Sequence, residues 1–347
     1  MIVMGKTATP ASHWVGALSA WYLRVQRSLP WRKTRDPYSI WISEVMLQQT
    51  QVSVVLGYYA RFLAAFPTVG ALAAAREPAV LSLWSGLGYY SRARNLHRGA
   101  KYLVANHKGN FPKTRGEILA VPGIGPYTAG AVLSIAFDLK EALVDGNVQR
   151  VFARFYAVED LLESKPAREF FWEKASEWVN ASDSPRVFNQ ALMELGAMVC
   201  TKANPRCGSC PLAGGCRANA AGTQAQYPKR KARRKAIQLS WNALVHEKAG
   251  KLLMVQNKPG DWWHGLWDFP REEASLKPPV GFALSVQQHT VTHHRIHVAP
   301  IVLGWKGPTR STPRRKWVTA EQARQLPLSS LAKKILAAYD RERGDRR

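Results

Sequence analysis

The chain has 347 residues, of which 46% are hydrophobic, so it is long enough for two domains that each bury a core. Its formal net charge is +25, with 25 basic and 15 acidic residues in 1–221 and 24 basic and 9 acidic residues in 222–347. This excess favours a polyanionic partner, and we expect nucleic acid and no membrane, because no segment has the length of a transmembrane span and no strongly basic amphipathic helix stands out.

The N-terminal residues lack the apolar core of a signal peptide, so we expect the protein in the reducing cytoplasm. From residue 14 to about 105 the pattern is helical, cut into short helices by proline-containing turns. In one of these helices Trp41, Val45 and Val52 are expected on an inward stripe, with Glu44 on the neighbouring stripe. A lone glutamate on such a helix is usually solvated, whereas an apolar wall around it would raise its pKa.

The next distinctive stretch, 83–95, joins a glycine-rich turn to tyrosines and arginines, among them Tyr89 and Arg92. This composition is typical of a surface that stacks on bases and binds phosphates. It fits a helix cap with tyrosines in the core equally well.

The stretch 119–150 contains the most informative pattern of the sequence. Gly123 and Gly125 break one helix and Pro126 stands where the first position of the next would be, which predicts a helix-hairpin-helix over about 117–137. A glycine-rich turn at a helix N-terminus exposes backbone N–H groups and lets the phosphate of a nucleic-acid backbone approach closely, although an ordinary hairpin has the same pattern. Asp145 follows at the start of a further helix, where it can act as an N-cap, as a second reactive carboxylate, or as both.

Four cysteines follow a helical stretch at 171–198, with the spacing C-x6-C-x2-C-x5-C. Four thiolates this close together in a reducing compartment favour a metal site, either a structural zinc or an iron–sulfur cluster. The spacing alone leaves both open. The cysteines are Cys200, Cys207, Cys210 and Cys216.

After a basic linker over 222–238, the spacing of the apolar residues changes from a helical pattern to the alternation of strands. Alternation of apolar and polar residues predicts strands over 237–245, 251–256, 296–305 and 316–318, and a helix is expected over 331–339. This pattern predicts a second domain of mixed class.

Residues 14–228 resemble the adenine DNA glycosylase family of the endonuclease III superfamily. The resemblance rests on six motifs in order and in spacing: LPWRKTRDPYSIWISEVMLQQTQV, LWSGLGYYSRARNLH, VPGIGPYTAGAVLSIAF, VDGNVQRVFARFYAV, FNQALMELGAMVC and the four-cysteine loop. It implies an all-α, two-lobed glycosylase domain over 1–221, with a 4Fe-4S cluster on the four cysteines of the loop 200–216. It also implies a monomer that acts on double-stranded DNA and removes adenine mispaired with 8-oxoguanine or guanine.

Residues 239–347 resemble the family's α+β Nudix-like domain, through the stretch WWHGLWDFP at 262–270. The glutamate cluster of a Nudix box does not follow, so we interpret the domain as a reader of lesion DNA and not as a hydrolase. The loop that reads 8-oxoguanine in the family usually carries Phe-Ser-His and here carries Val291, Thr292 and His293. His294 and His297 lie nearby, but the loop match disfavours a metal site there.

Cleavage of an N-glycosidic bond calls for an acid that improves the leaving group and a charge that stabilises an oxocarbenium-like sugar. The resemblance gives the first role to Glu44, which protonates adenine at N7, and the second to Asp145. It places Tyr127 where the lyase members carry a lysine, so no Schiff base can form. The remaining matched positions bind DNA or the adenine: Arg32, Gln49, Thr50, Leu87, Tyr89, Gly123, Gly125, Asn147, Thr292 and His293.

Two other functions remain open at this stage. A bifunctional endonuclease III-like lyase is opposed by Tyr127 and by the second domain. A non-catalytic DNA-binding protein needs only the charge and the hairpin, and the paired carboxylates oppose it.

Overall fold

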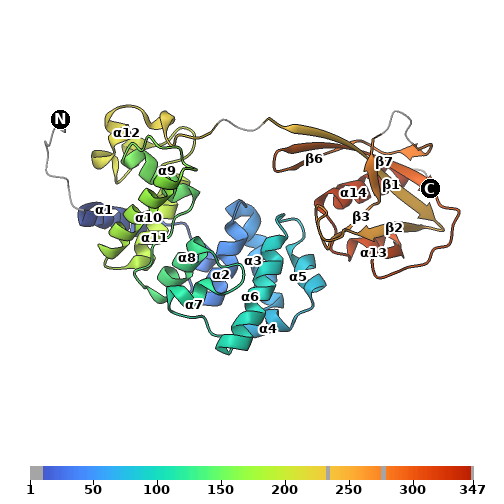
Figure 1. Cartoon of the computed structure of the whole chain (residues 1–347), viewed down its shortest axis with the longest axis horizontal. Coiled ribbons are helices and arrows are strands. Elements are labelled where there is room, and N and C mark those ends of the chain that lie inside the picture. The colour runs from blue at the N-terminus through green and yellow to red at the C-terminus, as the bar shows by residue number, and fades with distance from the viewer. Residues whose placement is uncertain (1–10, 232–234, 275–278, 345–347) are drawn as a thin grey trace. The chain divides into compact units, whose positions relative to one another are not determined.

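The computed structural model describes residues 11–231, 235–274 and 279–344. The chain forms two compact units, one from residues 1–74 and 95–232 and the other from residues 75–94 and 233–347 (Figure 1). The segment 75–94 therefore groups with the C-terminal part of the chain. The expected boundaries of 1–221, 222–238 and 239–347 stay a prediction.

The first unit is helical, as the sequence predicts. The helices α2 and α11 each begin with a proline that follows a polar cap, and in α2 the cap Asp36 accepts a hydrogen bond of 2.9 Å from the N–H of Ser39. The helices are α1 (Ala11–Val25), α2 (Pro37–Leu47), α3 (Val52–Ala65), α4 (Val69–Ala74), α6 (Ser91–His107), α7 (Arg115–Leu119), α8 (Pro126–Phe137), α9 (Gly146–Phe155), α10 (Lys165–Asn180), α11 (Pro185–Met198) and α12 (Arg217–Ala220).

Two stretches that the sequence analysis expects to be continuous are each divided into two helices. α2 ends at Leu47, and Val52 opens α3, so Val52 does not share a stripe with Trp41 and Val45. Gln49 causes the break, because its φ of 59° is incompatible with a right-handed helix. The stretch expected as helical over 171–198 is two helices, α10 and α11, separated by a turn before Pro185.

The predicted helix-hairpin-helix is confirmed as α7, a turn and α8. Gly125 caps α8 and Pro126 occupies its first turn. Gly123 has a φ of 85°, and a Cβ there would lie 2.6 Å from the Cβ of Asn95, so the turn requires glycine both for its backbone and for its packing. α8 then buries every residue from Thr128 to Ala136.

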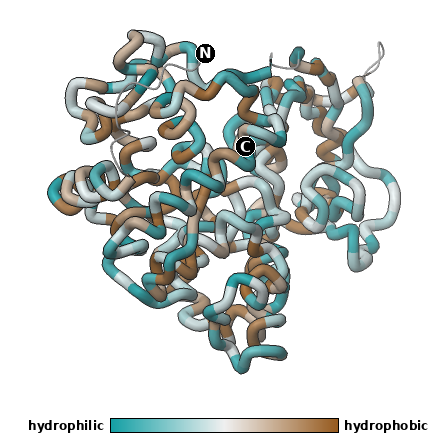
Figure 2. Tube along the Cα trace, turned by 60° about the vertical axis from the view of Figure 1, so that its left-hand side comes forward, coloured by the Kyte–Doolittle hydropathy of each residue, from teal (hydrophilic) through white to brown (hydrophobic). Residues whose placement is uncertain are grey.

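The helices that surround the candidate site pack on one another. α2 packs against α8, and α11 packs against α1, α8 and α9. Large aromatic side chains, including Phe152, Phe188 and Trp178, are almost fully buried in this unit. Hydrophobic and hydrophilic residues are interspersed along the helices, as expected for elements with one buried face (Figure 2).

The second unit contains a strand-rich domain. Its strands are β1 (Ile237–Lys248), β2 (Lys251–Gln256), β3 (Trp267–Asp268), β4 (Arg271–Glu273), β5 (Phe282–Ala283), β6 (Gln287–Val291), β7 (His294–Gly304) and β8 (Arg315–Val318). β1 and β7 run parallel, with Trp241 opposite Val298, while β6 and β7 form an antiparallel hairpin. The four strands expected from alternation are all present, and the sequence analysis missed the short strands β3, β4 and β5 and the hairpin strand β6.

Two helices complete this domain, α13 (Ala320–Arg324) and α14 (Ser330–Gly344). α14 lies beside the sheet in Figure 1, and its Leu331, Ile335 and Leu336 join the hydrophobic core with strand residues. The expected helix over 331–339 is therefore confirmed and extends further at its C-terminal end.

Helix α5 (Glu77–Trp84) and the turn after it belong to the second unit. Ser85 Oγ donates to the carbonyl of Leu328 over 3.0 Å, and Arg94 Nη1 donates to the carbonyl of His264 over 2.8 Å. Among the helices in the described ranges, none is long and apolar enough to cross a membrane.

Candidate active site

A cavity of about 860 Å³ opens in the first unit. It is lined by the C-terminal half of α2, the hairpin turn, the first turns of α8 and α9, and one face of α11. Three carboxylates, from Glu44, Asp145 and Glu194, share this cavity with Tyr127 and Arg32. The structure therefore brings together the three residues that the sequence analysis gives a chemical role.

Glu44 lies on α2 with only 5% of its surface exposed, so the usual solvated position of a helix glutamate does not apply. The hydroxyl of Tyr127 donates a hydrogen bond to Glu44 Oε2. Burial raises the pKa of Glu44 to about 7 and the carboxylate of Asp145 adds to the rise, while the Tyr127 hydrogen bond and the charge of Arg32 oppose it. The alternative of a buried Glu44 with a raised pKa, which the sequence left open, is therefore the one observed.

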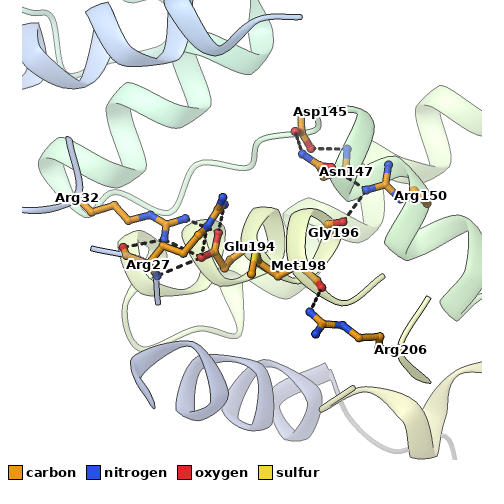
Figure 3. A network of polar contacts seen from close by, with 9 residues as sticks. All are labelled: Arg27, Arg32, Asp145, Asn147, Arg150, Glu194, Gly196, Met198 and Arg206. Atoms are coloured by element: carbon orange, nitrogen blue, oxygen red, sulfur yellow. Dashed lines mark hydrogen bonds and ion pairs between the residues drawn. The ribbon is translucent and has the colours of Figure 1, made fainter. Parts of the chain in front are cut away.

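Asp145 caps α9, as its position at the start of a helix predicts. Its Oδ1 accepts from the N–H of Asn147 over 2.9 Å and from the N–H of Val148 over 2.8 Å. Its Oδ2 accepts from the side-chain amide of Asn147 over 2.8 Å (Figure 3). Burial raises the pKa of Asp145 and these hydrogen bonds partly oppose the rise. The cap fixes the carboxylate at the cavity wall.

Tyr127 stands in the first turn of α8 and lines the same cavity. Burial raises the pKa of Tyr127 well above its ordinary value, and the charges of Glu44 and Asp145 raise it further. The phenol therefore stays protonated and acts as a hydrogen-bond donor to Glu44.

Glu194 is a site residue that the sequence analysis missed. It lies on α11 with its side chain 1% exposed, held between Arg27 and Arg32 (Figure 3). Arg32 donates to both oxygens at 2.9 and 2.7 Å, and Arg27 Nε donates at 2.8 Å. Burial alone would raise the pKa of Glu194, but these two arginines lower it to about 2. Its only signal in the sequence was a glutamate within an otherwise apolar stretch of the motif FNQALMELGAMVC.

The other expected contact residues fall into two groups. Gln49, Thr50, Gly123, Gly125 and Asn147 line the cavity of the first unit. The amide of Asn147 is already engaged, because its oxygen accepts from Arg150 Nη2 over 2.7 Å while its nitrogen donates to Asp145.

The second group belongs to the other unit. Leu87 is buried, whereas Tyr89 is 50% exposed with a φ of 46°. Thr292 and His293 form the turn between β6 and β7, where Thr292 is exposed with a φ of 54°.

The four cysteines line one small apolar cavity together with Val151, Phe155 and Leu195. Arg150 on α9 donates to the carbonyl of Cys200 over 2.7 Å, and the buried Arg154 lies 3.3 Å from Cys200 Sγ. The helix that Asp145 caps is therefore tied directly to the cysteine loop. Within the described residues, no set of three or more His, Cys, Asp or Glu side chains is arranged to hold a metal ion.

Comparison with known proteins gives two family matches. Residues 42–177 match the HhH-GPD superfamily base excision DNA repair protein family, and residues 242–338 match the NUDIX domain. The fold of the first part is also found in the structure of a thermostable thymine-DNA glycosylase, with a TM-score of 0.56 and 28% identity over 61% of this chain and 97% of that one. The expected fold class is confirmed.

Curated relatives extend the similarity to most of the chain. The adenine DNA glycosylase of Rattus norvegicus is 32% identical over 405 aligned residues, which cover 94% of this chain and 78% of that protein. The adenine DNA glycosylase of Buchnera aphidicola subsp. Baizongia pistaciae (strain Bp) is 43% identical over 198 residues, which cover 57% of this chain and 56% of that protein.

Proposed function

Because the chain belongs to the adenine DNA glycosylase family, we propose that it hydrolyses the N-glycosidic bond of adenine mispaired with 8-oxoguanine or guanine in double-stranded DNA, and leaves the strand intact. The observation that carries the proposal is the shared cavity of Glu44, Asp145 and Tyr127. A base must leave the duplex before its glycosidic bond can be reached, and this cavity is large enough to receive it.

Glu44 supplies the proton. With a pKa of about 7 it is protonated in a large fraction of molecules at neutral pH, and it can transfer that proton to the ring nitrogen of adenine. Because Tyr127 occupies Oε2, the other carboxylate oxygen can carry the proton. Protonation turns adenine into a neutral leaving group, and the positive charge develops on the sugar.

Asp145 faces that developing charge. A carboxylate fixed by two backbone N–H groups does not need to reorganise during the reaction, so it stabilises a cation efficiently or bonds to it before water attacks. Glu194 stays ionised between two arginines and holds Arg32 at the wall of the cavity.

The lyase alternative needs an amine near the sugar, and no lysine occurs among the described residues that line the cavity. The test is single-turnover adenine release from an A:8-oxoguanine duplex, analysed with and without alkali. We expect strand breaks only after alkali treatment. Borohydride trapping of the protein on DNA at a residue of this cavity would overturn the monofunctional assignment.

We also propose a 4Fe-4S cluster on Cys200, Cys207, Cys210 and Cys216. Four thiols around one apolar cavity fit a cluster, in which each cysteine binds a separate iron. Arg150 and Arg154 place positive charge beside it. The purified protein should be brown with about four irons per chain. Zinc without iron in anaerobically prepared protein would refute the cluster.

The remaining proposals concern partners. The hairpin glycines and Arg230 at the cavity provide backbone donors and positive charge for DNA, and the turn at Thr292 and His293 is proposed to read the lesion. A monomer and a cytoplasmic location remain predictions, which sedimentation and cell fractionation test.

A further inference from the structure

The turn 85–90, which joins α5 to α6, presents an aromatic side chain to solvent. Tyr89 is 50% exposed, whereas Trp84 and Tyr90 on its two sides are buried. Its φ of 46° lies in the left-handed region, which a large side chain rarely occupies unless the surrounding structure holds the backbone there. A phenol ring that is exposed and held in one conformation is suited to stack on a base. The contacts that hold this turn therefore decide where the ring points.

Arg92 fixes the turn from inside. It is 8% exposed, and its Nη2 donates to the carbonyls of Leu87 over 3.2 Å and of Gly88 over 3.3 Å. The indole N–H of Trp84 donates to the same carbonyl of Gly88 over 3.1 Å. The guanidinium of Arg92 also lies 5.6 Å from the centre of the Tyr89 ring, close enough for a cation–π contact. These contacts set the shape of the turn and the direction of the Tyr89 ring.

Ser85, the first residue of the turn, attaches it to the C-terminal part of the second unit. Its buried hydroxyl donates to the carbonyl of Leu328 over 3.0 Å, and its own carbonyl accepts from Nζ of Lys333 over 3.1 Å. These partners lie 243 and 248 positions later in the chain. We call Ser85, Leu328 and Lys333 the Ser85 clamp. Beyond the other end of the turn Arg94 Nη1 donates to the carbonyl of His264 over 2.8 Å, so the turn is held on both sides.

The partner of Ser85 belongs to a rigid, buried network. Leu328 is 1% exposed, and Ser329 and Asp268 beside it are fully buried. Ser329 Oγ donates to Asp268 Oδ2 over 2.8 Å and accepts from the N–H of Ala332, in the first turn of α14, over 2.9 Å. A buried polar network whose members are bonded to one another resists movement. The carbonyl of Leu328 is therefore a fixed point for the Ser85 hydroxyl.

Resting on the proposed function, we propose that Ser85 and Lys333 are positioning residues: the Ser85 clamp holds the turn 85–90 in the shape in which Tyr89 stacks on the duplex while the adenine is extruded. Extrusion of a base costs stacking energy, and an aromatic side chain that stacks on the remaining bases offsets part of this cost. The role concerns the extrusion of adenine and not the identity of the opposite base. The clamp therefore affects A:8-oxoguanine and A:G duplexes alike.

The first measurement is amide hydrogen exchange of residues 86–92 in the full chain without DNA. We expect Ser85→Ala to speed exchange there about fivefold, because a single hydrogen bond is worth about 1 kcal/mol. Ser82→Ala is the matched control, since it removes an exposed hydroxyl from the same segment. Lys333→Met should speed exchange in the same residues from the other side of the clamp. Its control is Lys334→Met, because Lys334 lies next to it on α14 but donates to the carbonyl of Gln288.

The second measurement is single-turnover adenine release. Ser85→Ala and Lys333→Met should each lower the rate about threefold to fivefold on both duplexes, with the ratio of the two rates unchanged. In a Tyr89→Ala background neither substitution should lower the rate further, because both act through Tyr89. A merely structural loss would add to the effect of Tyr89→Ala.

Exchange that stays unchanged in Ser85→Ala and Lys333→Met, or that rises equally in the two controls, would overturn the clamp. Rate losses that persist in full in the Tyr89→Ala background would overturn its action through Tyr89. If the native protein releases no adenine, the proposed function fails, and the exchange measurement still decides whether Leu328 and Lys333 hold the turn.

Discussion

The two units use carboxylates in opposite ways. In the first unit Glu44 and Glu194 are almost completely buried, and burial raises the pKa of Glu44 to about 7, whereas Arg27 and Arg32 outweigh burial and lower the pKa of Glu194 to about 2. In the second unit Asp261, Glu272 and Glu273 are exposed and line one cavity with Trp241 and Trp262. Burial changes what a carboxylate can do with a proton, whereas exposure keeps it available as a hydrogen-bond acceptor. The first arrangement suits the acid role that we propose for Glu44.

The largest effect should come from Glu44→Gln. The amide fills the same space and accepts the Tyr127 hydrogen bond, but it has no proton to give, so adenine release should fall at least about 100-fold. Single-turnover release from an A:8-oxoguanine duplex measures this, with binding of the same duplex as the control. A variant that keeps more than about a tenth of the native rate would remove Glu44 from the role of acid.

Asp145→Asn should lower the rate by about 100-fold while leaving the fold intact. Asparagine caps a helix as well as aspartate does, but it carries no charge to stabilise the sugar cation. Asp145→Ala is the matched variant, because it should lose about 1 kcal/mol of stability with the cap in addition to the rate. Equal rates in Asp145→Asn and in the native protein would mean that Asp145 is a cap and nothing more.

Glu194 provides a test through stability. Its pKa in the folded protein is about 2, below its ordinary value of 4.5, so its contribution is complete above pH 4.5 and is lost as the pH falls toward 2. That gap corresponds to about 3 kcal/mol. The free energy of unfolding should therefore fall more steeply between pH 5 and pH 2 in the native protein than in Glu194→Gln. Parallel pH profiles would show that the two arginines add nothing to Glu194.

A smaller effect is expected in the second unit. His293→Ala should reduce the preference for 8-oxoguanine over guanine several-fold, since base contacts specify while phosphate contacts only position. Adenine release from an A:G duplex serves as the internal reference. An unchanged preference would place lesion reading elsewhere in the chain.

Local patterns predicted much of this molecule. Pro126 after two glycines placed the hairpin, and alternation placed β1, β2, β7 and β8, whereas the local pattern favoured a solvated Glu44 and left its burial as the alternative. The pairing of Glu194 with Arg27 and Arg32 joins residues more than 160 positions apart, so no local pattern contains it. The break between α2 and α3 was also not predicted, because a glutamine side chain gives no sign that the backbone of Gln49 is left-handed.

The smallest effect on the rate should come from Tyr127→Phe. This variant tests directly how a neighbouring group sets the pKa of a buried carboxylate. The Tyr127 hydroxyl stabilises the ionised form of Glu44, so its removal should raise the pKa of Glu44 above about 7. Glu44 acts in its protonated form, and activity therefore falls as the pH rises through this pKa. The alkaline limb of the pH–rate profile should move to higher pH in Tyr127→Phe, with less than about a tenfold change in the rate at neutral pH. Single-turnover rates from pH 5.5 to pH 9 measure the shift, and Tyr89→Phe, which changes an exposed phenol of the second unit, is the control. A limb that stays in place, or moves to lower pH, would show that Glu44 is not the group whose proton is transferred.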